Sequence, residues 1–394
     1  MNLQDELNKI LKSILGKVEF NHVSSLLLNH TYLKRLTDRF RNSLRSNVDI
    51  IMTFAETKIT DKKYLELLLA LGNSCIVHGE NDIAKEILDK LLLLSKKGDG
   101  FLSITGHANL QIAIIESNQA NWVATQKSLR NAIKIFHELS DEIGLAECEN
   151  LLGTVEAEKG KLKLAEIHFR NAYSYVKYKR KNLLKSKIEI NLGIICNMLE
   201  KYEEAEIFYH KALIVFTEVK EQKRIAETTH NLGMLYLKVA KYKQAIKEFE
   251  KSIKISEVEN YNYIMGITFL GLAETYLLLG DIENATLNAD RGFEMCNKTN
   301  DRLTIADIYK VRGIICKKDK KYESAENYLL TCLRINKELK NELNTAEVNY
   351  ELGLLFEETK DSFKAVKHFK LALVYYREYN CQKEIQKIRI HLSK

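Results

Sequence analysis

The sequence of 394 residues contains no proline. At the usual frequency of about 5%, roughly twenty prolines would be expected in a chain of this length. Their absence excludes collagen-like and proline-rich architectures and argues against a β-sandwich or barrel built on Pro/Gly turns. Proline is tolerated least inside helices, and only 17 residues are glycine. An almost entirely helical chain is therefore predicted.

Long apolar runs and paired cysteines are also missing. The longest apolar run has only about six residues, from Leu371 to Tyr376, which is far shorter than a membrane span. The N-terminus has no apolar segment typical of a signal peptide. The seven cysteines are scattered, with no CxxC pair, which favours reduced thiols. These features predict a cytoplasmic protein without a membrane partner. The net charge of +7 is mild and does not demand nucleic acid.

Signatures of catalysis are absent from the sequence as well. It has no phosphate-binding loop, no dinucleotide-binding glycine motif, no HExxH and no GxSxG. None of the ten histidines has convincing metal-ligand spacing to Cys, Asp or His. Cys75, Cys196 and Cys316 occupy a position that is aromatic in other segments, so they are interpreted as small buried residues. The sequence predicts no enzyme, no cofactor and no metal site.

What the sequence does have is a repeat of forty residues. A small anchor residue recurs, and a second small residue, or threonine in one unit, follows it by twelve positions. The anchors are Gly72, Ala113, Gly153, Gly193, Gly233, Ala273, Gly313 and Gly353, and only the first interval is forty-one. A bulky residue follows each second small residue by four positions in seven of the eight units, and Ala289 is the exception.

These offsets predict a helix–turn–helix in every unit. Positions −1, 0 and +3 from the anchor share one helical face, and the later positions trace the face of a second helix. A turn between the two helices is marked by Gly79, Gly160 and Gly280, as expected just after a helix C-terminus. The small residues are predicted to lie where two helix axes approach closely, with the large residues beside them.

The pattern resembles the tetratricopeptide repeat (TPR), most clearly in NLGMLYLKVAKYKQAIKEFEKSI from Asn231 to Ile253. The resemblance covers about 64–385. The forty-residue period is similar to the long-helix repeats of kinesin light chain, Pins-type scaffolds and bacterial Rap-type receptors. It implies an all-α, right-handed superhelical solenoid of about eight units. The usual proline near the end of the second helix is replaced in this sequence by Thr217, Glu257, Asn297, Lys337 and Arg377.

The two ends of the chain depart from the repeat. Residues 1–63 contain helical stretches around Leu3 to Leu15 and Tyr32 to Phe54, with a break expected near His30 and Thr31. They are interpreted either as a cap for the array or as a small helical domain. Residues 386–394 are predicted to be a tail that continues the last helix. Without proline, helix ends are expected at residues such as Gly98, Gly100, Gly144, Asn260 and Asn300.

The resemblance also implies where a ligand would bind. In TPR proteins the first helices of successive units line a concave groove, and positions −3, +1 and +4 from each anchor are free of the core stripe. Asn191 and Asn231 resemble the groove asparagines of kinesin-light-chain-like repeats. The candidate groove residues are Ile190, Asn191, Ile194, Asn197, His230, Asn231, Met234, Leu237, Leu270, Glu274, Leu277, Lys310 and Lys317.

Three functions are consistent with this pattern. The first is a non-catalytic scaffold or adaptor that binds a peptide or protein segment in the groove. The second is a peptide-responsive bacterial regulator of the Rap/RNPP type, with 1–63 as effector segment. The third is self-association, or a groove filled by the N-terminal helices. The basic stretches at 175–187 and 360–394 are interpreted as solvated surface or as contacts for an acidic partner. Neither carries the recognition helix or interleaved aromatics of a nucleic-acid binder.

Overall fold

The computed structural model describes residues 3–34, 40–96, 99–179 and 182–393, and within these ranges every regular element is a helix. Three helices precede the repeats: α1 (Leu3–Ile14), α2 (Lys17–Lys34) and α3 (Phe40–Lys58). Eight helical hairpins follow, from α4 to α19, and a single helix, α20 (Gln382–Leu392), comes last. The all-α solenoid predicted from the sequence is confirmed.

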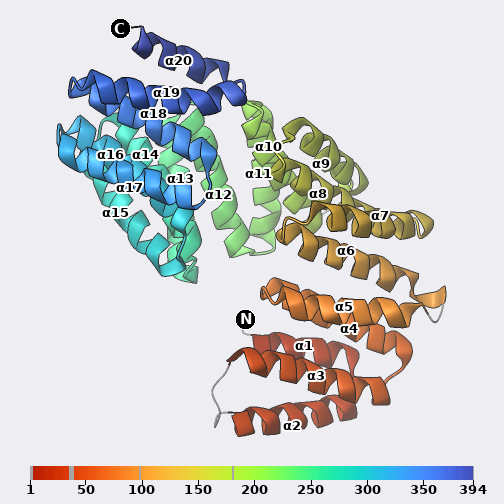
Figure 1. Cartoon of the computed structure of the whole chain (residues 1–394). Helices are drawn as coiled ribbons and strands as arrows, with labels where there is room; N and C mark the ends of the chain where they lie inside the picture. The colour runs from red at the N-terminus through yellow and green to blue at the C-terminus, as the bar shows by residue number, and fades with distance from the viewer. Residues whose placement is uncertain (1–2, 35–39, 97–98, 180–181, 394) are drawn as a thin grey trace. The chain divides into compact units, whose positions relative to one another are not determined.

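Each hairpin consists of a first and a second helix (Figure 1). The first helices are α4 (Asp61–Val77), α6 (Leu102–Asn118), α8 (Glu142–Glu158), α10 (Leu183–Met198), α12 (Gln222–Lys238), α14 (Asn262–Leu279), α16 (Arg302–Lys318) and α18 (Glu342–Glu358). The second helices are α5 (Asn81–Ser95), α7 (Trp122–Glu138), α9 (Leu162–Val176), α11 (Tyr202–Glu218), α13 (Tyr242–Glu259), α15 (Ile282–Thr299), α17 (Tyr322–Glu338) and α19 (Ser362–Glu378). A short 3-10 helix, η1 (Asp99–Phe101), precedes α6.

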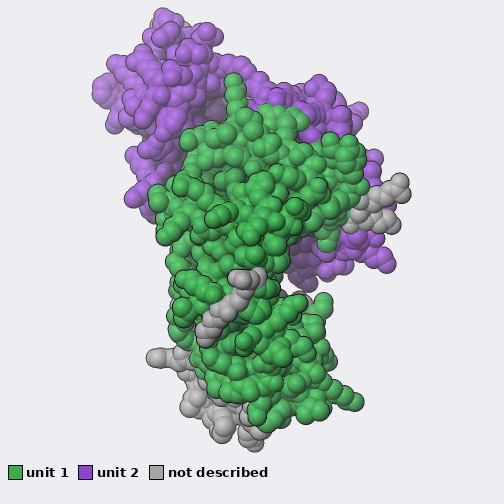
Figure 2. All heavy atoms as spheres, turned by 90° about the vertical axis from the view of Figure 1, so that its right-hand side faces the viewer, with its two compact units in different colours: residues 1–195 green, residues 196–394 purple. Residues whose placement is uncertain are grey.

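The chain forms two compact units, 1–195 and 196–394, which Figure 2 shows in green and purple. The division falls inside α10, near the middle of the array. In unit 1 the helix pairs α4–α5, α6–α7 and α8–α9 pack as hairpins, and α1 and α3 contact α4. In unit 2 the pairs α12–α13, α14–α15, α16–α17 and α18–α19 pack in the same way, and α20 contacts α19. The assignment of 1–63, 64–385 and 386–394 to separate parts stays a prediction, and α20 spans its last boundary.

The turns between helices share one geometry. From Ala120 to Asn380 every twentieth described residue has a positive φ, between 53° and 80°, and Gly79 has the same conformation. At Ser140, for example, the backbone N–H donates to the carbonyl of His137 (3.1 Å), and the next N–H, of Asp141, donates to that of Phe136 (2.9 Å). This pair of bonds is the Schellman motif, which satisfies the last carbonyls of a helix.

The residue after the positive-φ position begins the next helix. Asp141 both ends one helix and caps the next. Its N–H donates to the last turn of α7, and its carboxylate accepts from the N–H groups of Ile143 (3.0 Å) and Gly144 (3.1 Å) in α8. Side chains cap four further helices in this way, at Asp281, Asp301, Asn341 and Asp361. Two residues therefore suffice to end one helix and start the next, which produces the twenty-residue half-period.

Close approach within each hairpin accounts for the small anchor residues. A Cβ atom added at Gly233 on α12 would lie 2.5 Å from the Phe249 ring on α13. The same construction at Gly353 on α18 would lie 2.6 Å from the Phe369 ring on α19. Both rings are almost completely buried. The predicted small-against-large packing is confirmed, because the ring occupies the volume that the glycine leaves empty.

We expect Gly233→Ala to destabilise unit 2 despite the better helix propensity of alanine. The propensity gain is about 1 kcal/mol, whereas forcing a methyl group against a buried ring costs about 1–3 kcal/mol. The denaturation midpoint should fall, and Phe249→Leu in the same chain should recover part of the loss. Gly100→Ala is the control, since a Cβ there meets no atom within 4 Å. Equal effects of both single changes would contradict the packing argument.

Several expectations about helix ends are corrected. Helix α2 continues through His30 and Thr31 to Lys34, because neither residue breaks a helix as proline does. Asn260 and Asn300 do end helices with positive φ, as expected. Gly144 instead lies buried in the first turn of α8, and Gly100 lies in η1. Gly98 lies outside the described residues.

Helix α14 is the one described helix that is long and apolar enough to span a membrane by length and composition. Over half of it (56%) is buried, and it packs against α12, α13, α15 and α16. Its composition agrees with a core helix that has neighbours on several sides. A search for uninterrupted apolar runs does not find this helix, because Glu274 and scattered small residues interrupt its apolar sequence.

Candidate functional site

The first helices of successive hairpins lie side by side and form one face in each unit. In unit 1 α4 contacts α6, and α6 contacts α8. In unit 2 α12 contacts α14, α14 contacts α16, and α16 contacts α18. We call this surface the first-helix face. It is the surface on which the sequence predicts ligand binding.

A pocket of about 430 Å³ lies on the first-helix face of unit 1. Four first helices, α4, α6, α8 and α10, contribute to its lining. Its apolar lining comes from Leu110, Ile114, Leu151 and Leu184, and its amide side chains come from Asn73, Gln111 and Asn150. Apolar side chains combined with convergent polar groups are typical of a ligand site.

Three ionisable groups complete this pocket: Glu147, His107 and Lys187. Burial raises the pKa of the Glu147 carboxyl, while His107 and Lys187 oppose the rise. The ring nitrogen Nδ1 of His107 lies 2.8 Å from the carbonyl oxygen of Ser103, to which it donates, so Nε2 is the ring nitrogen left for a ligand. The pocket thus offers a carboxyl group, an ammonium group and an imidazole ring within one small volume.

The candidates on α10 have different environments. Ile190 is buried and belongs to the core, whereas Ile194 is exposed. The Asn191 amide donates to Oδ1 of Asn150 on α8 at 2.9 Å, which connects α10 to an amide of the pocket. Asn197 hydrogen-bonds the buried Tyr209 hydroxyl. Only Asn191 of this group is therefore brought next to the unit 1 pocket.

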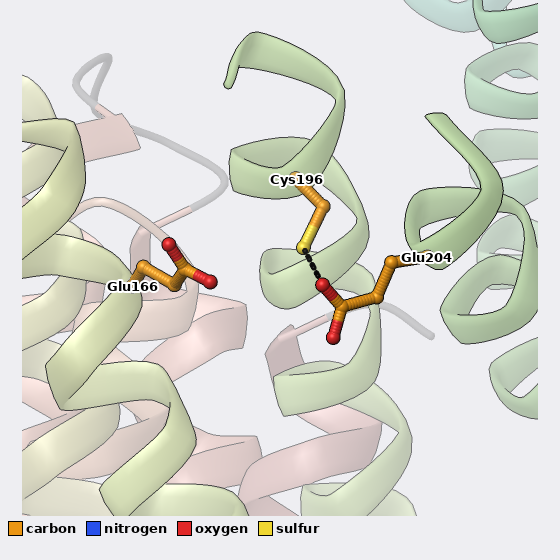
Figure 3. A group of neighbouring side chains, drawn as sticks. All are labelled: Glu166, Cys196 and Glu204. Carbon is orange, nitrogen blue, oxygen red and sulfur yellow. Dashed lines mark hydrogen bonds between the residues drawn. The ribbon is translucent and has the colours of Figure 1, made fainter. Parts of the chain in front are cut away.

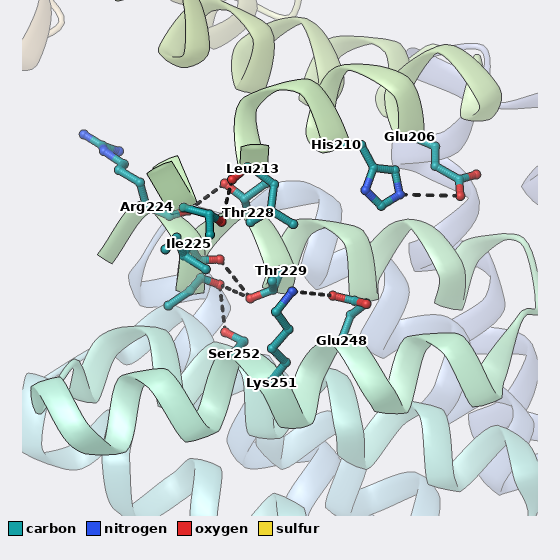
Figure 4. Close-up of polar contacts among 12 residues, drawn as sticks. Glu206, His210, Leu213, Arg224, Ile225, Thr228, Thr229, Glu248, Lys251 and Ser252 are labelled. Carbon is teal, nitrogen blue, oxygen red and sulfur yellow. Dashed lines mark hydrogen bonds and ion pairs between the residues drawn. The ribbon is translucent and has the colours of Figure 1, made fainter. Parts of the chain in front are cut away.

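On α12 the candidates lie half-buried, and His230 takes part in a polar network. Its Nδ1 lies 3.0 Å from the Thr268 hydroxyl of α14, and Ser252 of α13 lies 3.4 Å from the same hydroxyl. Ser252 donates to the carbonyl of Ala226 at 2.8 Å. Figure 4 shows the Ser252 bond, which joins α13 to α12, beside the bond from the Thr229 hydroxyl to the Ile225 carbonyl within α12. The network joins three helices, so His230 connects hairpins. Asn231, Met234 and Leu237 remain half-buried on the same helix.

Burial lowers the pKa of His230 to about 4, compared with 6.5 for a free histidine. Because the unfolded chain binds the proton more tightly, the free energy of unfolding should fall as the pH drops below 6.5 and level off near 4. The loss attributable to His230 is up to about 3 kcal/mol. Glu274, with a pKa raised to about 7, contributes an opposite slope. The measurement is therefore the difference between wild type and His230→Asn in urea unfolding from pH 4 to 8. A difference that does not change with pH would contradict the assignment.

The candidates on α14 and α16 form a charged cluster. Burial raises the pKa of Glu274, and the carboxylates of Asp307 and Glu347 add to this effect while Lys310 opposes it. The Lys310 ammonium lies 2.6 Å from Glu347 of α18 and 3.5 Å from Asp307. The Lys310 ammonium is therefore paired with carboxylates of the same chain. Leu270 is half-buried and Leu277 is buried.

Lys317 is similarly engaged, because its Nζ lies 2.9 Å from the Glu351 carboxylate of α18 while the residue is only 8% exposed. The sequence predicts Lys310 and Lys317 as groove residues. Their ammonium groups pair with the carboxylates of Glu347 and Glu351 on α18, the first helix of the next hairpin. The groove role of the thirteen candidates stays a prediction.

The cysteines agree with a structural role. Cys75 and Cys196 are buried and Cys316 is half-buried. Burial raises the pKa of the Cys316 thiol. Figure 3 shows the Cys196 sulfur directed toward Glu204, whose carboxylate accepts its hydrogen at 3.7 Å. Protonated thiols of this kind are unreactive.

Sequence reasoning missed most of the unit 1 pocket, although a signal was available. Positions −3 and +1 from the first two anchors give Leu110, Asn73 and Ile114, but the stripe was followed only from the third unit onward. Asn150 also lies at position −3, from the third anchor, whereas the ionisable groups lie outside the positions of the stripe. His107, Glu147 and Lys187 all lie six residues before their anchors, about one turn before position −3 on the same helices.

Comparisons with known proteins agree with this architecture. The family model described as Tetratricopeptide repeat matches residues 185–257 and 224–298. No curated protein sequence matches the chain. Three solved structures illustrate the likeness in fold. Aspartyl phosphate phosphatase F from Bacillus subtilis has 15% identity and a TM-score of 0.60, over 94% of this chain and 93% of that chain. A Rap protein complexed with competence and sporulation factor has 17% identity and a TM-score of 0.61, over 93% and 99%. The apo form of the quorum sensor NprR from B. thuringiensis has 13% identity and a TM-score of 0.60, over 85% and 99%.

These identities are low, so the likeness concerns the fold. One of the three structures is named a phosphatase, and the expectation that this chain has no catalytic activity stays a prediction. The repeat period, the hairpins and the family model agree with one another. Residues 185–298 match the tetratricopeptide-repeat model, and the chain shares the helical-repeat fold of the three solved structures.

Proposed function

We propose that the protein is a non-catalytic scaffold that binds a peptide or protein segment along its first-helix face. The observation that carries this proposal is the unit 1 pocket, which spans four consecutive first helices. A ligand that crosses several hairpins must be extended, and a peptide is an extended molecule with regularly spaced polar groups. The proposed location is the cytoplasm, with no membrane or nucleic-acid partner.

The lining of the pocket is suited to a peptide. Asn73, Gln111 and Asn150 carry both donors and acceptors, as a peptide backbone does. The pocket is large enough for a side chain of the ligand, and extended peptides gain affinity from backbone hydrogen bonds together with such side-chain pockets. Glu147 and Lys187 can receive groups of opposite charge. The similar Rap structure is a complex with competence and sporulation factor, which supports a peptide ligand by analogy.

A second candidate is a peptide-responsive bacterial regulator in which the N-terminal helices act on a partner. The similarity to aspartyl phosphate phosphatase F covers 94% of this chain, so it extends into the helices before the repeats. That extent favours an N-terminal segment with its own role over a simple cap. Under this hypothesis the peptide binds the first-helix face and alters what α1 to α3 present.

The test is selection of binding peptides from a random display library with the full-length chain, followed by calorimetry on the recovered sequences. Recovery of related sequences that bind with a stoichiometry of one would support the scaffold proposal. A selection that yields no binding peptide would count against it. For the regulator, deletion of Met1 to Ile59 should leave peptide affinity unchanged and abolish the cellular response. A deleted chain that aggregates would favour the cap.

A further inference from the structure

The outer face of α19 differs from the outer faces of the neighbouring second helices in unit 2. Four large apolar side chains on it are exposed: Phe363 (83%), Val366 (37%), Leu371 (49%) and Val374 (65%). Among the described residues, α13, α15 and α17 each expose one such side chain, namely Val258, Leu287 and Leu330. A cluster of exposed apolar residues on one helix marks an interaction surface more strongly than isolated ones do.

Basic side chains lie on the same exposed face of α19. Phe363, Lys367, Lys370, Val374 and Arg377 follow one another at intervals of four and three residues, so they share one side of α19. Lys367, Lys370 and Arg377 are exposed. None of these three forms an ion pair with any residue that the structure describes, whereas Lys364 on the same helix reaches Glu326 and Asp361.

Beside this stripe the surface is hollowed. A pocket of about 430 Å³ between the end of α17, the start of α18 and α19 is lined by Leu371, Val374 and Tyr375 from α19, by Lys337 of α17 and by Lys340 of the following turn. The carboxylates of Glu342 and Glu378 also line it. Lys337 and Lys340 thus balance the two carboxylates in the pocket, and Lys367, Lys370 and Arg377 add three exposed cations on the adjoining side of α19.

We propose that the groove between α17 and α19 is a second docking surface, distinct from the first-helix face, for an acidic amphipathic helix of a protein partner. Apolar side chains of that helix would fill the hollow beside Leu371 and Val374, and its carboxylates would meet Lys337, Lys340, Lys370 and Arg377. A bilayer fits less well, because a planar surface leaves the hollow empty. A second copy of this face fits less well too, because it would bring like charges together. This surface would operate whether or not the first-helix face binds a peptide.

The test uses the full-length chain and a labelled synthetic helical peptide with leucine at positions i, i+3, i+7 and i+10 and glutamate on both flanks. Fluorescence anisotropy should show binding that weakens as salt rises. The double variant Leu371→Glu/Val374→Glu should weaken binding at least tenfold, and Lys370→Glu/Arg377→Glu should weaken it similarly and flatten the salt dependence. All four positions are exposed, so the chain should stay folded.

The matched control is Leu287→Glu on α15, which is 46% exposed and should leave the affinity unchanged. Three outcomes would overturn the proposal. One is equal peptide binding by wild type and Leu371→Glu/Val374→Glu. The second is binding of the wild type to vesicles of phosphatidylglycerol and phosphatidylcholine but not to the peptide. The third is a wild-type dimer in sedimentation that Val374→Glu dissociates, which would identify a second copy as the occupant.

Discussion

Asn73→Trp will weaken binding of a peptide selected on the full-length chain by at least 100-fold, which corresponds to about 2.7 kcal/mol. Asn73 is exposed on α4 and lines the unit 1 pocket, so an indole there fills the space without disturbing the core. A peptide whose side chain packs against Leu110 and Leu151 would lose that contact. Calorimetry on purified variants measures the effect, and circular dichroism verifies the fold.

The comparison variant is Met234→Glu combined with Leu270→Glu on the first-helix face of unit 2. Both residues are half-buried candidates from the sequence. We expect this variant to bind the peptide within about threefold of wild type, a change below about 1 kcal/mol. The opposite pattern, with binding lost only in the unit 2 variant, would move the site to unit 2 and leave the proposed function intact. Unchanged binding in both variants would remove the first-helix face as the peptide site.

Glu351→Ala will destabilise the α16–α18 region by about 3 kcal/mol, because it leaves the buried ammonium of Lys317 without its carboxylate. Restoring the match with apolar groups, as in Lys317→Met/Glu351→Leu, should return the stability to near the wild-type level. Neighbouring repeats can unfold separately, so hydrogen exchange of amides in α16 and α18 is the appropriate measurement.

The control for this prediction is the pair Lys298–Glu294 on α15. Its atoms are also 2.9 Å apart, yet both side chains are at least half exposed. Glu294→Ala should change stability by less than about 0.5 kcal/mol, since water already solvates both charges. If the two alanine substitutions cost the same, burial of Lys317 would not be the source of the effect.

The hairpins could be predicted from sequence because the packing of each one is local and repeated. Gly233 and Phe249 are sixteen residues apart, and the same small-and-bulky pairing recurs in other units at that spacing. A pattern repeated at constant spacing is visible in a single sequence. The exception is Ala289 on α15, a small residue where other units have a bulky one. In this hairpin the two helices also approach closely at Gly266 and Gly292, where a Cβ added at Gly292 would lie only 3.3 Å from the Gly266 carbonyl oxygen.

The turns could not be predicted in the same way. Eleven described residues other than glycine adopt positive φ, among them Lys320, Lys340 and Ala240, and nothing in these residue types favours that conformation. The conformation is imposed by the hydrogen bonds that close the preceding helix. The geometry also explains the missing prolines at the turns. The first turn residue needs a positive φ, and both turn residues donate their N–H groups.

The polar contacts between first helices could not be predicted from the sequence, because they join residues of different hairpins. Lys310 and Glu347 are separated by 37 residues, and Asn150 and Asn191 by 41. The forty-residue period places such residues on adjacent first helices but does not say which pairs meet. That depends on side-chain conformations and on the small rotation between hairpins. The sequence therefore predicts which residues lie on the first helices, while the ion pairs of Lys310 with Glu347 and of Lys317 with Glu351 required coordinates.

The uniform turn has a consequence for how the length of such an array can change. Asn300 and Lys340 have nearly the same backbone conformation, with φ of 53° and 54°, and Asp301 and Asn341 both cap the following helix. An in-frame deletion of 301–340 would therefore join Asn300 to Asn341 without altering either the turn or the cap. Each joint accepts any hairpin of the set, so hairpins can be gained or lost as whole modules, and only the side chains at the new contact between modules would need to adapt.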